Sequence, residues 1–130
     1  MRETTVDAMT LERIGRVVQQ ERALLRLSLK ACAHCALCAE SCFLFRQSGG
    51  DPTYSPSYKV INSLGRIART GGKMADAEYE RIRDLVWNKC VLCMRCHCPI
   101  GISLPPLIAA ARAACRERGV ERWYAARRNA

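Results

Sequence analysis

Several features that this chain of 130 residues lacks narrow what it can be. No run approaches the roughly 18 apolar residues of a membrane-spanning helix, so we expect no direct membrane span. No stretch alternates polar and apolar residues as a half-buried strand does, and we therefore predict an all-α fold. The sequence also has no Gly-rich dinucleotide fingerprint, no P-loop and no Ser/His/Asp set. We expect the chain to have no catalytic residues of its own.

Aromatic residues make up only 6% of the chain, whereas cysteine is abundant. Eight of the nine cysteines fall in two short runs, which are Cys32, Cys35, Cys38 and Cys42, and then Cys90, Cys93, Cys96 and Cys98. Three cysteines at this spacing wrap a loop around an iron–sulfur cubane, and in two-cluster ferredoxins the fourth cysteine of each run ligates the other cluster. We therefore predict two [4Fe–4S] clusters, one held by Cys32, Cys35, Cys38 and Cys98 and the other by Cys90, Cys93, Cys96 and Cys42. Because few aromatic residues are available to pack in the core, we expect the clusters to act as cross-links, and their loss should unfold much of the domain.

Other uses of cysteine explain this pattern less well. A zinc site usually takes two CxxC pairs, which leaves the third cysteine of each run without a role. A disulfide framework suits a secreted chain, but the first ten residues are polar and mixed in charge, unlike a secretory signal. Structural cysteines would be scattered along the chain. The ninth cysteine, Cys115, lies in an Ala-rich segment, and we expect a buried, unreactive thiol there.

The second run departs from the usual spacing, because one residue and not three separates Cys96 from Cys98. Side chains on either side of such a residue can still serve two different clusters. His97 is an alternative fourth ligand, as histidines are in Rieske centres. We expect both His97 and His34 to lie beside the ligands or in solvent. The first run is followed by Phe43 where the ferredoxin pattern has proline.

The formal net charge of +9 raises the question of nucleic-acid binding. An oxidised [4Fe–4S] core with four thiolates carries about −2, so two such sites reduce the net charge to roughly +5. The basic residues are spread along the chain without interleaved aromatic residues, and we expect no nucleic-acid partner. The excess could instead form a docking face for an acidic protein. Arg95, inside the second run, is predicted to raise the potential of the nearby cluster.

The apolar spacing predicts helices on both sides of each cysteine run. They should cover residues 10–30 with Thr10 as the N-cap, 55–70 with Pro56 near the start, 76–87 with Asp76 as the N-cap, and 105–118 after Pro105-Pro106. The N-terminal amides of the last helix are candidate donors to cluster sulfurs. We expect residues 1–9 to be a flexible tail, 10–118 an α-helical dicluster ferredoxin domain and 119–130 a basic tail.

The stretch Trp87-Asn-Lys-Cys-Val-Leu-Cys-Met-Arg-Cys-His-Cys-Pro-Ile-Gly-Ile, with two helices before it, resembles the heterodisulfide reductase C-like family. It is equally similar to the N-terminal half of related fused iron–sulfur proteins in the membrane redox complexes of sulfate reducers. The resemblance covers about residues 30–118. The first cysteine run is generic to helical ferredoxin domains, whereas the second, with its Pro-Ile-Gly, is more specific.

The resemblance implies a cytoplasmic electron-transfer subunit of sulfur or methanogenic metabolism. Its relatives pass electrons between a flavin and iron–sulfur A-like subunit and a cysteine-rich, catalytic B-like subunit. The residues carried over are the eight cysteines of the two runs, and none of them is catalytic. Two other hypotheses stay open: the iron–sulfur module of a different flavin-dependent oxidoreductase, and a zinc or iron–sulfur regulator that binds nucleic acid.

Overall fold

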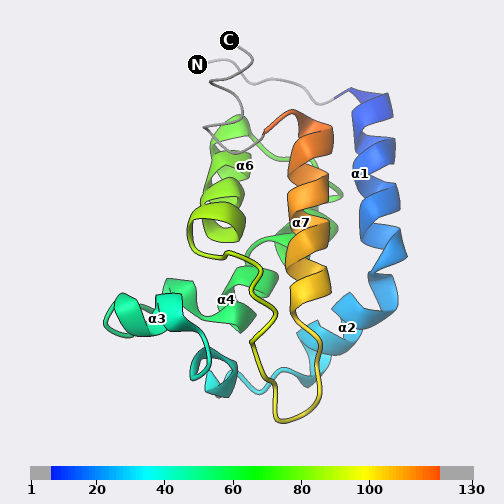
Figure 1. Cartoon of the computed structure of the whole chain (residues 1–130). Helices are drawn as coiled ribbons and strands as arrows, with labels where there is room; N and C mark the ends of the chain where they lie inside the picture. Colours follow the sequence, from blue (N-terminus) through cyan, green and yellow to red (C-terminus); the bar gives the residue numbers. More distant parts are fainter. Residues whose placement is uncertain (1–6, 121–130) are drawn as a thin grey trace.

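The computed structural model describes residues 7–120, and in this part of the chain it contains helices and no strands (Figure 1). The helices are α1 (Ala8–Gln20), α2 (Arg22–Ala31), α3 (Phe43–Gln47), α4 (Pro56–Ile61), α5 (Leu64–Thr70), α6 (Asp76–Arg83) and α7 (Pro105–Arg118). Single turns stand between them, namely η1 (Leu37–Ala39), η2 (Pro52–Tyr54) and the π-helical η3 (Asp84–Asn88). The predicted all-α class is confirmed.

Helix α7 is the centre of the fold and contacts α1, α4, α5 and α6. Its alanines leave room for neighbouring backbones to approach closely, and Ala111 and Ala114 are fully buried. Leu107, Ile108 and Cys115 are buried as well. The predicted start at Pro105 and the end before Gly119, a left-handed C-cap, are both confirmed.

The predicted single helix over residues 10–30 is wrong. The structure has two helices with a break at Glu21, and α1 packs on α7 whereas α2 contacts α5. Thr10 is not the N-cap, because the side chain of Asp7 accepts a hydrogen bond from the Thr10 amide and the helix begins at Ala8. Residues 1–6 of the predicted N-terminal tail, and 121–130 of the predicted C-terminal tail, lie outside the described residues.

The second predicted helix begins at Pro56 as expected but is also interrupted. Ser63 has a non-helical backbone, and the Asn62 side chain donates to the Tyr58 carbonyl at the end of α4. Downstream, α5 ends at Gly71, whose φ of +65° suits a residue without a Cβ. The third predicted helix has Ala75, not Asp76, as its N-cap, and its last turn widens into η3 just before the second cysteine run.

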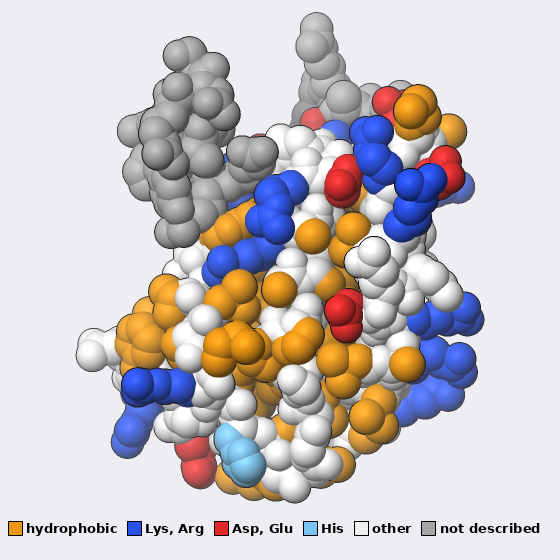
Figure 2. Space-filling view, turned by 45° about the vertical axis from the view of Figure 1, so that its right-hand side comes forward, with side chains coloured by type: hydrophobic (Ala, Val, Ile, Leu, Met, Phe, Trp, Pro, Cys, Tyr) orange, Lys and Arg blue, Asp and Glu red, His pale blue; other side chains and the backbone are white. Residues whose placement is uncertain are grey.

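Both cysteine runs lie at the end of the molecule away from the upper turns of α1, α6 and α7 (Figure 1). The face in Figure 2 carries mainly hydrophobic and uncharged side chains over its lower half, with lysines and arginines at its margins. Among residues 7–120, no helix combines the length and the apolar character needed to cross a bilayer.

Candidate iron–sulfur site

The fold brings the two cysteine runs together around two neighbouring cavities. The first cavity is lined by Cys32, Cys35, Cys38 and Cys98. The second cavity is lined by Cys42, Cys90, Cys93 and Cys96. Each cavity thus receives three cysteines from one run and a fourth from the other run.

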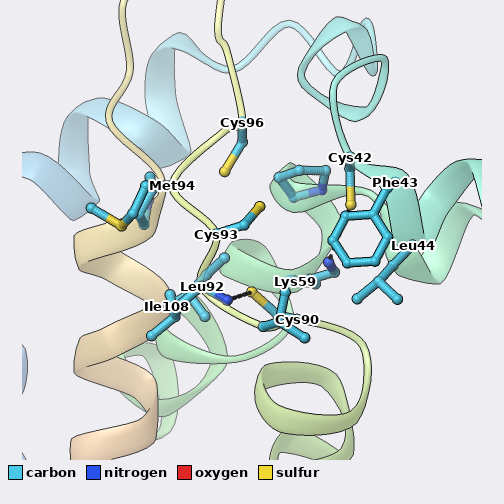
Figure 3. Close-up of a pocket in the computed structure, with 13 residues that line it drawn as sticks. Cys42, Phe43, Leu44, Lys59, Cys90, Leu92, Cys93, Met94, Cys96 and Ile108 are labelled. Carbon is cyan, nitrogen blue, oxygen red and sulfur yellow. Dashed lines mark hydrogen bonds between the residues drawn. The ribbon is translucent and has the colours of Figure 1, made fainter.

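Apolar residues line the second cavity around its thiols. Phe43 and Leu44 follow Cys42 at the start of α3, while Leu92 and Met94 flank Cys93 in the loop (Figure 3). The first turn of α7 closes the cavity with Pro105 and Ile108. Cys42 and Cys90 are buried while Cys93 is exposed, and the apolar lining leaves few groups to compete with the thiols for iron.

The two loops share one backbone conformation, which the cysteine spacing alone did not reveal. In the first loop His34 and Ala36, on either side of Cys35, have φ of +55° and +60°. In the second loop Leu92 and Met94, on either side of Cys93, have φ of +53° and +68°. Alternation of left- and right-handed residues turns successive backbone N–H groups toward one concave side, which favours an anion such as an iron–sulfur centre.

Hydrogen bonds around the sulfur atoms differ between the cavities. At the second cavity the Leu92 amide donates to Cys90 Sγ at 3.4 Å, and Lys59 Nζ donates to Cys42 Sγ at 3.9 Å. At the first cavity Cys38 Sγ lies 3.9 Å from Ser55 Oγ. The second cavity therefore has a cationic donor where the first has a hydroxyl.

Lys59 is a residue that the sequence analysis missed. Its side chain lines the second cavity, and the residue is only 1% exposed. The available signal was its position, since Pro56, three residues before it, and Ser63, four residues after it, are both buried. A lysine on the buried stripe of a helix is unusual enough to indicate a role in a site.

Burial and mutual repulsion act on the thiols of the second cavity. Burial, followed by negative charge on Cys90, Cys93 and Cys42, raises the pKa of Cys96 to about 11. Such thiols bind as thiolates only when a strongly positive centre replaces the proton, and bound metal does this. The donor set therefore fits a cluster of iron ions.

Arg112 connects the central helix to the start of the second loop. Its Nε donates to the Val86 carbonyl and its Nη2 to the Cys90 carbonyl, both at 2.7 Å. Its guanidinium also lies over the Trp87 ring, 5.6 Å from the ring centre. These contacts fix the π-helical turn and Cys90 against α7.

Other predicted site residues lie apart from the thiols. His34, Arg95 and His97 line neither cavity, and His34 and Arg95 are exposed. Cys115 is fully buried, which confirms the predicted burial, and this burial raises its pKa to about 12.

The prediction that α7 amides donate to a cluster is wrong. Pro105 and Pro106 have no N–H, and the amides of Leu107 and Ile108 both donate to the Leu104 carbonyl. No amide of the first helical turn is left to reach a cluster sulfur.

The geometry and the donors define an iron–sulfur protein with two cluster sites. The model of the 4Fe-4S dicluster domain family matches residues 28–102, more than half of the chain, and the protein belongs to this family. It carries two [4Fe–4S] clusters and serves in electron transfer. No single-ion site with three or more Cys, His, Asp or Glu side chains occurs within residues 7–120. Searches of curated proteins and of solved structures gave no match.

Proposed function

We propose that the protein is the electron-transfer subunit of a cytoplasmic heterodisulfide reductase-like complex in sulfur or methanogenic metabolism. It would relay electrons one at a time between a flavin and iron–sulfur A-like subunit and a cysteine-rich B-like subunit. The observation that carries this proposal is the crossed arrangement of eight cysteines around two adjoining cavities.

The crossing supports ligation of one cluster by Cys32, Cys35, Cys38 and Cys98 and of the other by Cys90, Cys93, Cys96 and Cys42. Cys96 and Cys98 are two residues apart, so their Cα atoms are separated by at most about 7 Å. Leu104 lines the first cavity and its neighbour Pro105 the second. Clusters this close can exchange electrons within the chain, as a relay requires.

The surroundings of the cavities support docking of other redox proteins. Exposed hydrophobic side chains line both of them, with Ile100 at the first and Phe43, Val91 and Met94 at the second. Exposed apolar residues grouped around a functional site are typical of protein interaction surfaces. The two groups would allow one partner at each cluster.

Cluster content and ligand identity are tested first. The protein purified without oxygen should contain roughly eight iron and eight sulfide ions per chain and give coupled cubane EPR signals after reduction. Cys98→Ser should perturb one cluster, whereas the neighbouring His97→Ala should leave both intact. Loss of a cluster in His97→Ala, with Cys98→Ser unaffected, would assign the ligand to the histidine. Stoichiometric zinc without sulfide would refute the electron-transfer role and favour the regulator.

The partner is tested by reconstitution. The reduced holoprotein is mixed with a B-like subunit, and oxidation of its clusters is followed by their visible absorbance when a disulfide substrate is added. We expect the clusters to be oxidised only when the B-like subunit and the disulfide substrate are both present. Re-reduction by a flavoprotein alone, with no effect of any B-like subunit, would favour the module of another flavin-dependent oxidoreductase.

A further inference from the structure

We infer that Lys59 makes the cluster of the second cavity the more easily reduced of the two, so that electrons enter the chain at the first cavity and leave at the second. This inference rests on the proposed relay and deepens it, because it assigns a direction.

The burial of Lys59 requires an anionic neighbour. An ammonium group removed from water is strongly unfavourable unless it is paired with negative charge. The ion pairs formed within residues 7–120 do not include Lys59, and its hydrogen-bond acceptor is Cys42 Sγ at 3.9 Å. In Figure 3 its nitrogen points into the group of cysteines toward Cys42. A cluster with four thiolates, at about −2, supplies the charge that a neutral thiol does not.

The first cavity has no counterpart of this lysine. Apart from the cysteines, its lining among the described residues is neutral, with Ser28 and Ser57 as its polar side chains. The hydrogen bond at its sulfurs joins Cys38 Sγ and Ser55 Oγ, two uncharged groups of which either can donate. The two clusters share a loop conformation and a ligand type, so a buried charge is the clearest difference between them.

Reduction transfers one electron to a cluster, takes its core from 2+ to 1+ and makes the thiolate-ligated site more negative. In the relay the electron comes from a reduced flavin, and in a titration from dithionite; no bond is formed or broken. A fixed positive charge in a site of low dielectric stabilises the reduced state more than the oxidised state and raises the potential. Electrons should therefore collect on the second cluster, beside exposed Phe43, Val91 and Met94.

The test is an anaerobic potentiometric titration of the holoprotein, followed by EPR. Lys59→Met removes the charge and keeps most of the length of the side chain. We expect the higher of the two midpoints to fall, with the reduced-to-oxidised ratio at fixed potential decreasing at least about tenfold, which is about 59 mV for a one-electron couple. The lower of the two midpoint potentials should be the same in Lys59→Met as in the wild type. Lys73→Met, which removes an exposed lysine that lines neither cavity, should shift neither midpoint.

Assignment of the signals keeps the inference testable if Lys59→Met loses iron. Cys93→Ser changes the EPR spectrum of the second cluster and Cys35→Ser that of the first, so the signal that appears on one-electron reduction of the wild type can be assigned. A first-reduced signal that belongs to the Cys35 cluster would overturn the inference. The inference would also be overturned if Lys59→Met keeps its iron and its higher midpoint potential equals that of the wild type. In that case the eight iron ions of the variant would still support the proposed function.

Discussion

Arg112→Met should loosen the second cysteine loop, because Arg112 ties its first cysteine and the preceding π-helical turn to α7. Two hydrogen bonds of 2.7 Å run from its guanidinium to the Val86 and Cys90 carbonyls. A hydrogen bond from a charged donor contributes about 1.5–3 kcal/mol, and stacking on Trp87 adds about 0.5–1 kcal/mol. Since the side chain is only half-buried, the lower values apply, and loss of both hydrogen bonds and the stacking should destabilise the folded holoprotein by about 3.5 kcal/mol.

The assay is the rate at which urea bleaches the visible absorbance of the clusters without oxygen. If the contacts are already broken in the transition state for unfolding, the full loss appears in this rate, and about 3.5 kcal/mol corresponds to a roughly 400-fold increase. Arg112→Lys keeps the charge but cannot make the same pair of hydrogen bonds, so its bleaching rate should lie between those of the wild type and Arg112→Met. Arg116→Met, on the exposed side of the same helix, should stay within about threefold of wild type. A rate for Arg112→Met no higher than that of the Arg116 control would refute this account of the loop.

Three further substitutions test separate parts of the argument. Ala36 has a φ of +60°, which costs a residue with a Cβ roughly 1–2 kcal/mol; Ala36→Gly should therefore stabilise the holoprotein by about 0.5–1 kcal/mol after the greater freedom of glycine in the unfolded chain is counted. Bleaching at a lower urea concentration would contradict this. Burial raises the pKa of Cys115 and of Tyr79 to about 12, above their values of about 8.5 and 10 in the unfolded chain. The contribution of these two neutral side chains to the stability of the folded protein is therefore complete below about pH 8.5 and is lost as the pH rises toward 12. Cys115→Ala should remove the first part of this alkaline loss of helical circular dichroism, and an unchanged pH profile would argue against it. Arg95 is exposed to water, where two charges 4 Å apart interact by about 1 kcal/mol against about 4 kcal/mol at an effective dielectric constant of 20. Arg95→Glu should therefore lower the nearby midpoint less than Lys59→Met does, and a larger shift would show that exposure does not control the effect.

The cluster count and the all-α class could be predicted from the sequence because both depend on local patterns. Cysteine spacing reports how a loop wraps a cubane, and Pro105 and Gly119 mark helix ends through their own backbone preferences. The breaks at Glu21 and Ser63 could not be predicted in this way. Apolar residues continue at helical spacing across both breaks, and at Glu21 the two halves pack on different partners, α1 on α7 and α2 on α5.

The charged residues near the clusters also could not be predicted from local sequence patterns. Arg95 drew attention because it stands between cysteines in the sequence, yet it is exposed and lines neither cavity. Lys59 is 17 positions from Cys42 and reaches it because the fold places α4 at the lining of the second cavity. Distance along the chain therefore says little about the electrostatic surroundings of a cluster, which are set by helices between the runs.

The fold thus assigns binding and tuning to different parts of the chain. Cysteines and left-handed residues recur at matching positions in both loops, so each loop supplies three ligands to one cluster site and the other run supplies the fourth. What differs is supplied from outside the loops: a serine hydroxyl at Cys38, and the Lys59 ammonium from α4 at Cys42. Since neither contact alters the spacing of the cysteines, substitutions on α4 could change a potential without loss of a ligand. This separation explains why a cysteine pattern predicts which cofactor is bound but does not predict the order in which two such cofactors are reduced.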